Sequence, residues 1–485
     1  SLEIPENAEL TESEDGKLVK KLNANSFKHT TKKLKKEKKK NEEIISIGNV
    51  RNYELKNNKE RTTTGNKIIV TINDDENRTT ETMSIPNNPV ITETEIGKST
   101  RRISANNLIH HSEKLKKGTK KKTEKTVLTD NVRIYEKKGD KESLTVCKKL
   151  IMTNNELENE RIETFSIPGK TVITETQKNE LIKKIISDKF LHEIKYTGRK
   201  PFEEKSEITT FTGNVKYFEK EKGRTRNTES DKIVLTQDSK KRTEGMELSG
   251  NVVIVENKKD GTLDRKITSK NVLYTAFLDR NKKKIKELTF ITGDPRVLTD
   301  KQSIRAMRIQ MEKTPGTEMW ELKGRVFILD LKSKDELRGE FAYFDKIIEI
   351  MRVTEKASFY INKDKTTVKS NNITSYNKKK FTYFVGDVEI VQETKRIYGE
   401  KAFFNEALKK IIITGEPFLV NDNNVLSADV MTFYTEKKEV RMSSNFHGSL
   451  SMEEEQRRTP STQTEQIEED VGNVEAGDIG GPEIL

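Results

Sequence analysis

The chain is short of several features that mark compact or membrane-spanning proteins. It has one cysteine, Cys147, so it forms no intramolecular disulfide and does not report its redox compartment. No apolar run is long enough to cross a bilayer. Hydrophobic residues make up 32% of the 485 residues and aromatic residues 6%, against 35% charged residues, which is too little apolar material for a thick core. A thin two-layer β structure, which buries only alternate residues, tolerates this composition.

The sequence also lacks the motifs of catalysis and metal binding. There is no G-x-S-x-G, no P-loop and no H-E-x-x-H, and the many acidic residues form no recognisable catalytic pair. His29, His110 and His192 occupy nearly corresponding places in three repeats, and three stacked imidazoles would suit a metal ion or a pH response. Because no Cys or paired-His spacing accompanies them, descent of the repeat explains their correspondence. We therefore predict no enzyme activity, no cofactor and no metal site.

What the chain does have is a repeat. An Ile-Pro segment begins at Ile4 and returns at Ile85 and Ile167, after 81 and then 82 residues. The hexapeptides NVRNYE, NVRIYE and NVKYFE follow nearly the same spacing and begin at Asn49, Asn131 and Asn214. A fixed period is typical of stacked architectures, in which each unit buries its apolar face against its neighbours. The repeat therefore predicts one long body.

After about residue 245 the period shortens. GNVVIVE, GRVFILD and GDVEIVQ correspond to the Asn-Val segments, and ITGDPRVLTD and ITGEPFLVND correspond to the Ile-Pro segments. Each long unit thus contains two related half-units, of which we count roughly a dozen. We predict three regions: long repeats over residues 1–245, shorter repeats over 246–442, and a disordered acidic tail over 443–485. Residues 451–485 carry ten acidic residues, two basic residues and no aromatic residue.

Alternation of apolar and polar residues indicates β-strands throughout. Val388 and Ile390 show the period of two that places apolar side chains on one face. Gly and Asn at the segment starts supply turn conformations, and prolines suit strand starts, where a missing N–H is tolerated. Residues 397–415 read as strand, polar turn and strand, with the turn at 405–410. The one weak helical pattern lies between residues 179 and 186.

The half-unit resembles the OstA-like repeat of the bacterial lipopolysaccharide-transport (Lpt) family. That repeat reads G-N/D-V-x-I-x-Q/E, then I-x-A/G-D/E-x-A-x-Y/F-D/N, a charged turn, an apolar strand and G-x-P. The best copy is GDVEIVQETKRIYGEKAFFNEALKKIIITGEPFLV, residues 386–420, followed by VLSADVMTFYTEKKEVRM, in which Ala428 and Asp429 stand at the family's A-D pair. The C-terminal third matches well. The first 245 residues match through degenerate copies with Lys-rich insertions, which the shorter familiar members lack.

The resemblance implies an all-β fold, an elongated open β-jellyroll (β-taco) of two antiparallel sheets built from tandem repeats. Its apolar interior would shield the acyl chains of lipopolysaccharide or a related glycolipid during transport from the inner to the outer membrane. The resemblance also implies a periplasmic location and end-to-end strand pairing with the inner-membrane Lpt transporter, the outer-membrane translocon and further copies of the chain. Because the chain starts at Ser1, we expect that an export signal or anchor has already been removed.

An inward apolar stripe is our candidate for the lining of a lipid groove. A closed, fully packed core would use the same residues, so a closed-core repeat protein with a structural or surface-interaction role stays open as the alternative. The candidate residues are Val388, Ile390, Ile397, Phe404, Ile411, Ile413, Phe418, Leu426 and Phe433, with Val252, Ile254, Val326 and Ile328 at equivalent positions.

The net charge of +12 leaves an anionic partner open. Much of the excess lies in Lys-rich runs at residues 32–40 and 114–122. Such runs attract phosphate-bearing headgroups or nucleic acid, or are solvated loops. Proteins that bind single-stranded nucleic acid place aromatic residues among the basic ones, and the run at 32–40 has none. We therefore predict no nucleic-acid partner.

Overall fold

The computed structural model describes residues 1–14, 17–34, 39–56, 58–95, 97–116, 121–157, 159–198, 204–422 and 424–449. These residues form 36 strands in one antiparallel sheet, so the predicted all-β fold is confirmed. None of the described segments forms a helix that is long and apolar enough to cross a membrane. The weak helical pattern near residue 180 was misleading, because strand β15 (Glu180–Ser187) pairs there with a strand on each side.

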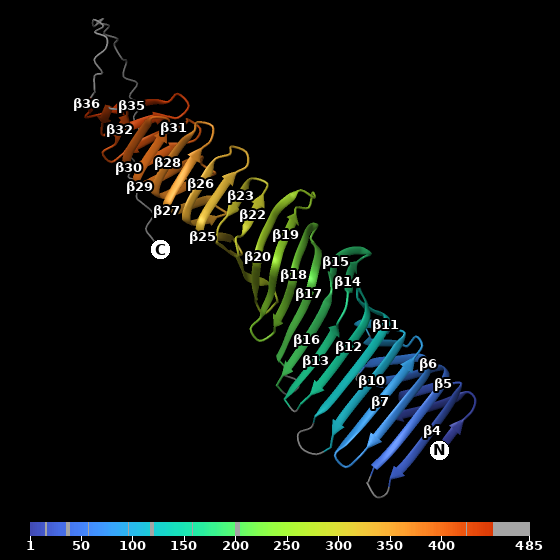
Figure 1. Ribbon diagram of the computed structural model, residues 1–485. Coiled ribbons are helices and arrows are strands. Elements are labelled where there is room, and N and C mark those ends of the chain that lie inside the picture. Colours follow the sequence, from blue (N-terminus) through green and yellow to red (C-terminus); the bar gives the residue numbers. More distant parts are fainter. Residues whose placement is uncertain are drawn as a thin grey trace, which may run out of the picture.

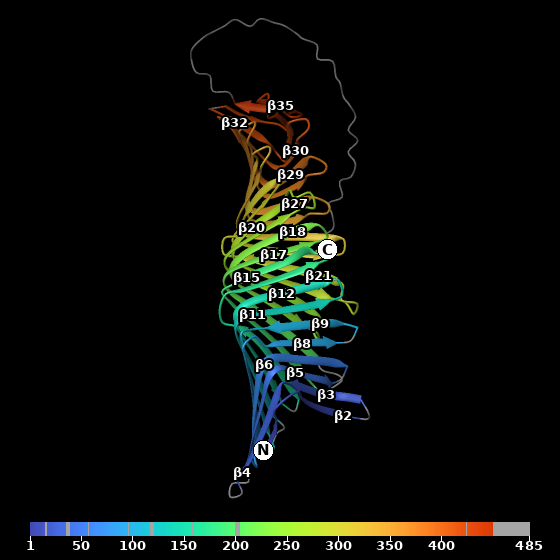
Figure 2. The same ribbon diagram turned by 90° about the vertical axis from the view of Figure 1, so that its right-hand side faces the viewer.

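The chain crosses the body from side to side about 25 times, and successive crossings pair with each other along the long axis (Figures 1 and 2). Many crossings are single long strands: β5 (Lys39–Lys56), β6 (Lys59–Asp74), β11 (Lys122–Lys138), β12 (Lys141–Glu156), β17 (Glu204–Glu221), β18 (Arg224–Asp238), β19 (Thr243–Asn257), β20 (Leu263–Leu278), β25 (Thr317–Asp330), β26 (Glu336–Asp345), β27 (Ile350–Ile361), β28 (Thr366–Tyr376), β29 (Phe381–Gln392) and β30 (Lys395–Asn405).

The remaining crossings are broken into two short strands. The pairs are β1 (Leu2–Ile4) with β2 (Ala8–Glu14), β3 (Lys17–Ala24) with β4 (Ser26–Leu34), β7 (Arg78–Pro86) with β8 (Val90–Glu95), β9 (Ser99–Ser104) with β10 (Asn107–Leu115), β13 (Glu160–Ile167) with β14 (Thr171–Gln177), β15 with β16 (Lys189–Thr197), β21 (Lys284–Thr292) with β22 (Arg296–Thr299), β23 (Gln302–Arg305) with β24 (Arg308–Thr314), β31 (Lys410–Thr414) with β32 (Phe418–Asn421), β33 (Asn424–Ser427) with β34 (Val430–Tyr434), and β35 (Glu439–Ser443) with β36 (His447–Ser449).

Every crossing bends at the same line, which we call the corner. The part of the crossing on one side of the corner belongs to the first wall of the body, and the part on the other side belongs to the second wall. In β5, residues 39–47 pair with β4 in the first wall and residues 51–54 pair with β3 in the second wall. The strands therefore form one folded sheet rather than two separate sheets, because the long strands carry their backbone hydrogen bonds past the corner. The hairpin turns lie at the two open edges, which we call the first rim and the second rim.

Two successive residues of positive φ make the corner in β5, β11, β17, β19, β25, β27 and β29, and in β5, β17 and β19 they are a Gly-Asn pair. Gly250 and Asn251 both have positive φ, +74° and +48°, and the pairing register of β19 with β20 shifts there. This is a β-bulge, which adds residues to one strand and bends it. Leu248 before the bulge and Val252 after it both point inward, each 1% exposed. Gly and Asn were expected to supply turn conformations at the segment starts; both take positive φ here, but the bend lies inside a continuous strand.

In the broken crossings, proline or a small residue stands at the corner. Pro295 and Pro417 lie between β21 and β22 and between β31 and β32, where a missing N–H costs no ladder hydrogen bond. Ala306 and Ala428 lie at the next corner position and donate their N–H to the carbonyl of Pro295 and Pro417, at 3.5 and 3.2 Å. Both alanines are buried, so the A-D pair of the repeat is a corner element.

Two crossings make one half-unit, and about 25 crossings agree with the dozen half-units counted in the sequence. At about 4.8 Å per strand the body is about 120 Å long.

β19 runs across residue 245, so the change of repeat length falls within a strand. The buried core does not divide at residue 245. It forms one cluster whose last member is Ile167 and a second cluster whose first member is Ile185, and Phe190 packs against both. Strand structure reaches Ser449, and residues 450–485 of the predicted tail lie outside the described residues.

The bulge allows a direct test of the corner. Ala at position 250 would take a left-handed conformation and place its Cβ 2.8 Å from the Cβ of Asp231. Gly261 has a similar φ of +82° but nothing within 4 Å, so Gly261→Ala is the matched control. We expect Gly261→Ala to cost about 1–2 kcal/mol of local stability, and Gly250→Ala to cost about 1–3 kcal/mol more. Native-state hydrogen exchange of β18 to β20 measures both, and equal losses would contradict this account of the corner.

Candidate functional site

The inner face next to the corner is an almost unbroken apolar row on the first wall, which we call the floor. Backbone register connects its members from strand to strand, and Ser46 is the one polar member. Between Phe27 and Met431 the floor consists of Phe27, Ser46, Ile68, Ile85, Leu108, Leu128, Leu150, Ile167, Phe190, Phe211, Ile233, Leu248, Val272, Ile291, Ile309, Leu322, Ala342, Val353, Ile373, Phe384, Ala402, Ile413 and Met431.

Most of the residues expected to line a groove point inward. Those that are buried are Val252, Ile254, Val326, Ile328, Val388, Ile390, Ile397, Phe404, Ile411, Ile413 and Phe433. Leu426 is half-buried and packs against this core. Phe418 does not point inward: its side chain is 39% exposed and stacks on Tyr398 of the outer face, with ring centroids 4.8 Å apart. The neighbouring Leu419 takes the inward position, because the corner at Pro417 shifts the alternation by one residue.

A cavity of about 140 Å³ lies between the two walls in the C-terminal half. Its apolar part is lined by Ile328 and Phe359 of the second wall and by Ile373 and Phe404 of the first wall. Polar groups surround its mouth, with Asp330 and Asp335 on one side and Lys380 and Lys409 on the other. An apolar interior with a polar mouth suits an amphipathic chain. The volume is below the 300–1,000 Å³ of typical ligand pockets.

Beyond this cavity a polar cluster, which we call the clasp, joins the two rims. Gln392, 2% exposed, places its Nε2 2.8 Å from the Asp364 carbonyl oxygen and 2.9 Å from Thr366 Oγ1 on the second wall. The same Nε2 lies 3.0 Å from the carbonyl oxygen of Thr435, at the first rim. The Thr435 hydroxyl donates to the Asp364 carboxylate. Because both rims supply partners, the clasp closes the mouth between the walls at this point.

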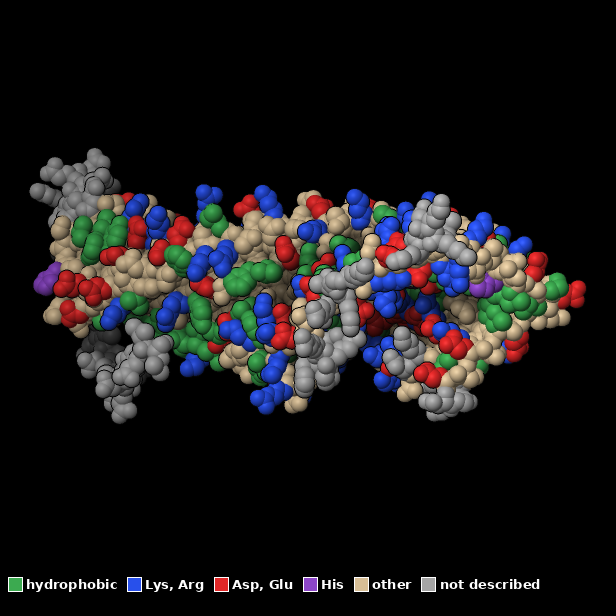
Figure 3. Space-filling model, turned by 90° about the horizontal axis from the view of Figure 1, so that it is seen from below, with side chains coloured by type: hydrophobic (Ala, Val, Ile, Leu, Met, Phe, Trp, Pro, Cys, Tyr) green, Lys and Arg blue, Asp and Glu red, His purple; other side chains and the backbone are tan. Residues whose placement is uncertain are grey.

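In the N-terminal half the second wall carries a row of alternating charges above the floor. The register aligns Glu54, Arg61, Glu93, Arg101 and Glu136 on successive crossings. Arg61 and Glu93 lie 3.6 Å apart and Arg101 and Glu136 3.0 Å apart. The Arg101 guanidinium lies over the ring of Phe165 on the opposite wall, 5.4 Å from its centroid. Charged side chains are visible around the hollow in this half of the molecule (Figure 3).

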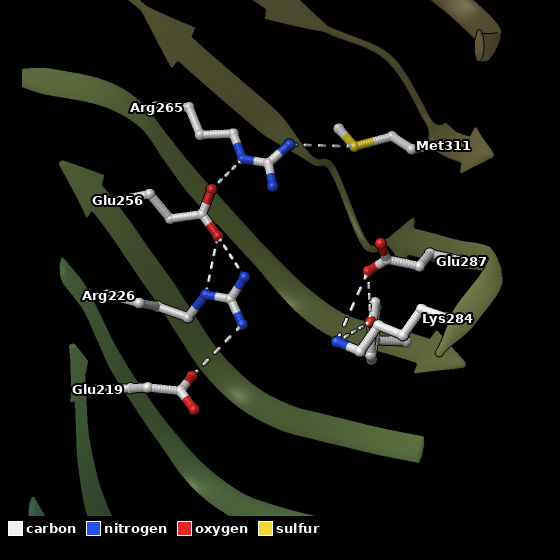
Figure 4. A network of polar contacts seen from close by, with 8 residues as sticks. Glu219, Arg226, Glu256, Arg265, Lys284, Glu287 and Met311 are labelled. Carbon is white, nitrogen blue, oxygen red and sulfur yellow. Dashed lines mark hydrogen bonds and ion pairs between the residues drawn. The ribbon is translucent and has the colours of Figure 1, made fainter. Parts of the chain in front are cut away.

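The charge row ends in the network drawn in Figure 4. Arg226 pairs with Glu219 at 3.9 Å and with Glu256 at 2.7 Å, and Glu256 also binds Arg265. Burial acts to raise the pKa of Glu256, but Arg265 and Arg226 outweigh it and hold that pKa below its ordinary range. Nη1 of Arg265 reaches Met311 of the first wall at 3.8 Å. The network therefore spans the groove and separates the charged N-terminal interior from the apolar C-terminal interior.

Neither the charge row nor the clasp was predicted from the sequence, although one motif position contributes a residue to each. The last residue of the NVxxxE segment points inward, four residues after the buried valine. This position holds Glu54, Glu136, Glu219 and Glu256 in the earlier segments, Asp330 at the cavity mouth and Gln392 in the clasp. Because this residue follows the inward valine by four positions, period-two alternation could have placed it on the inner face.

The three histidines lie at equivalent places on the inner face, as their repeat spacing indicated, but they do not meet. They belong to β4, β10 and β16, and successive ones are four crossings, or about 19 Å, apart. His110 Nδ1 lies 2.9 Å from Thr126 Oγ1, and His192 Nδ1 lies 2.8 Å from Thr209 Oγ1. Throughout the described part of the chain, no three His, Cys, Asp or Glu side chains are grouped to hold a metal ion.

Comparisons with known proteins give little further information. No family model matches the chain, and no curated protein matches it. Among solved structures, the chain is similar to LptH, the LptA-homologous periplasmic component of the lipopolysaccharide transport device of Pseudomonas aeruginosa. The similarity has 10% sequence identity and a TM-score of 0.24, and it covers 25% of this chain and 97% of LptH. A similarity at this level does not bear on the function of the chain.

The clasp should stabilise the C-terminal end locally. Gln392→Ala leaves buried acceptors on both walls without a donor, so we expect the free energy of local opening to fall by about 1–3 kcal/mol. The matched control is Gln237→Ala, because Gln237 is exposed at the first rim and should change stability by less than about 0.5 kcal/mol. Hydrogen exchange of β28 to β30 measures the effect. Unchanged protection in Gln392→Ala would show that the clasp does not hold the walls together.

The half-buried histidines His110 and His192 predict a pH dependence. Burial is the main cause that lowers the pKa of His110 and of His192 in the folded chain. The unfolded chain therefore takes up these protons first, and stability is full above about pH 6.5 and falls as pH drops through the lower folded pKa. Hydrogen-exchange protection of β10 and β16, corrected for intrinsic rates, should fall between about pH 7 and 5. His110→Gln with His192→Gln should reduce this slope, whereas His447→Gln, at an exposed position in β36, should leave it unchanged.

Proposed function

We propose that the chain is a non-enzymatic lipid conduit of the periplasm. It would shield the acyl chains of lipopolysaccharide or a related glycolipid between the inner and outer membranes. The observation that supports this proposal is the floor, a buried row, apolar except at Ser46, that continues through successive crossings for about 105 Å. Because water penalises exposed hydrocarbon, a transported acyl chain needs such a continuous path. The inward residues beside the corner supply this continuous path, and the path requires no catalytic step.

Two further features support the conduit. The cavity beside Phe359 and Phe404 lies where an acyl chain would enter, with its polar mouth facing water. The outermost strands are each paired on one side only within the described chain: β2 with β3 at one end, and β35 with β34 at the other. Free strand edges accept further strands. We propose that these ends dock on the inner-membrane Lpt transporter, the outer-membrane translocon or further copies of the chain.

A closed-core structural protein is the second candidate, and the tight packing of the floor favours it. Many floor side chains, Ile233, Ile309 and Val353 among them, have no exposed surface at all. The conduit therefore requires a motion that separates the walls, whereas the closed-core protein does not. The two functions differ in whether lipid ever contacts an inward side chain.

Site-specific photocrosslinking separates the two candidates. A benzophenone amino acid replaces Phe404, which lines the cavity, and in a second variant it replaces Phe418, which points outward on a neighbouring crossing. After incubation with lipopolysaccharide or a photostable phospholipid, we expect lipid adducts at position 404 and at least about tenfold fewer at 418. Absence of adducts at 404, and also in a third variant with the crosslinker at the inward Ile390, would support the closed core. Equal adducts at 404 and 418 would indicate adsorption to the surface.

A further inference from the structure

The last four turns of the first rim share the same design. Each turn has four residues, joins two strands of the first wall, and ends in a residue with positive φ. The turns are 346–349, 377–380, 406–409 and 435–438. The N–H groups of Asn377, Glu406 and Thr435 donate to the carbonyl oxygens of Glu349, Lys380 and Lys409, at 3.1, 3.1 and 3.0 Å. These bonds connect neighbouring turns, so the rim presents its side chains from a fixed backbone.

Two of these turns expose large aliphatic side chains at their tips. Ile347, Ile348 and Leu408 are 50%, 52% and 58% exposed. Asp345 Oδ1 accepts the N–H of Ile347 and of Ile348, at 2.9 and 3.1 Å, which fixes the first tip. Turns 331–335 and 362–365 of the second rim, in the same part of the molecule, expose no large apolar side chain. The aliphatic tips are therefore a property of one rim, and no packing contact accounts for them.

Lysines and aromatic rings surround the tips. Turn 377–380 contains three successive lysines, and Lys380 and Lys409 form no ion pair with a described residue. Behind the turns the ring of Phe381 lies 4.7 Å from that of Tyr376, 5.3 Å from that of Tyr383 and 5.5 Å from that of Phe403. Exposed aliphatic residues with lysines and a row of aromatic rings are the composition of surfaces that lie in a bilayer interface.

We propose that this first rim docks on an anionic membrane surface. Ile347, Ile348 and Leu408 would enter the interface, and the lysines of the rim would bind the anionic headgroups. Lys380, Lys409 and Tyr376 also line the cavity mouth, so docking places that mouth against the bilayer. A lipid chain could then pass between bilayer and groove without crossing water. This last step rests on the proposed function, whereas docking itself does not.

Vesicle flotation of the full chain tests the docking. We expect co-flotation with phosphatidylcholine vesicles that contain phosphatidylglycerol, and at least about tenfold less with phosphatidylcholine alone. The triple variant Ile347→Ser, Ile348→Ser, Leu408→Ser should lower the bound fraction about tenfold. Lys378→Gln, Lys379→Gln, Lys380→Gln should lower it on the anionic vesicles. All six positions are exposed, so thermal unfolding should stay unchanged.

The second rim supplies the matched control. Lys332→Gln, Lys334→Gln, Lys365→Gln removes the same charge from exposed turns without aliphatic tips, and it should leave flotation unchanged. The proposal is wrong if the wild-type chain does not float with anionic vesicles, if this control loses as much binding, or if binding survives the loss of the aliphatic tips. Adducts at Phe404 without flotation would refute docking and leave the conduit standing. Flotation without lipid adducts at Phe404 would support docking and refute the conduit.

Discussion

The structure depends on a backbone constraint: each strand must bend sharply while its hydrogen-bond ladder continues. Two successive residues in the left-handed region, such as Gly250–Asn251 or Gly386–Asp387, meet this constraint, and glycine at the first position avoids a clash with the neighbouring strand. Other long strands, such as β6 and β18, continue past the corner without such a pair, and where a crossing is broken, proline or a small residue such as Ala428 stands at the same line. Because every crossing bends in register, the inward residues beside the corner align into one floor along the whole body.

Distance from the corner determines the polarity of the interior. Most positions next to the corner are apolar in both halves of the molecule, with buried exceptions such as Ser46 and Ser187, since both walls cover them there. Farther out, the final residue of each NVxxxE-type segment decides what the groove contains. Glutamates at this position pair with arginines of neighbouring strands, Asp330 borders a cavity, and Gln392 joins the rims. The residue at this motif position thus differs between the charged interior of the N-terminal half and the clasped mouth near the C-terminal end.

The two halves would therefore contribute differently to lipid movement. The N-terminal half offers a shallow apolar floor below paired charges, where a headgroup could stay hydrated above its chains. The C-terminal half offers a deeper apolar interior, but Gln392 and Thr435 hold its rims together at one end. Tight packing and transport are compatible only if the walls open locally, and opening is least costly where few contacts join them, as at the cavity between Asp330 and Lys380.

The sequence by itself determined the strands, the repeat and most of the inward stripe, because period-two alternation and the Gly-Asn-Val spacing are local properties of the chain. It placed Val388, Ile390 and Phe404 correctly, and it failed at Phe418, where a corner changes the alternation. Only the tertiary structure decided that Gly-Asn pairs lie within strands, that Glu256 faces Arg226 and Arg265, and that Asp364 meets Thr435 across 71 residues. Those contacts depend on which crossings become neighbours and how far the walls close, and neither is encoded in any single segment.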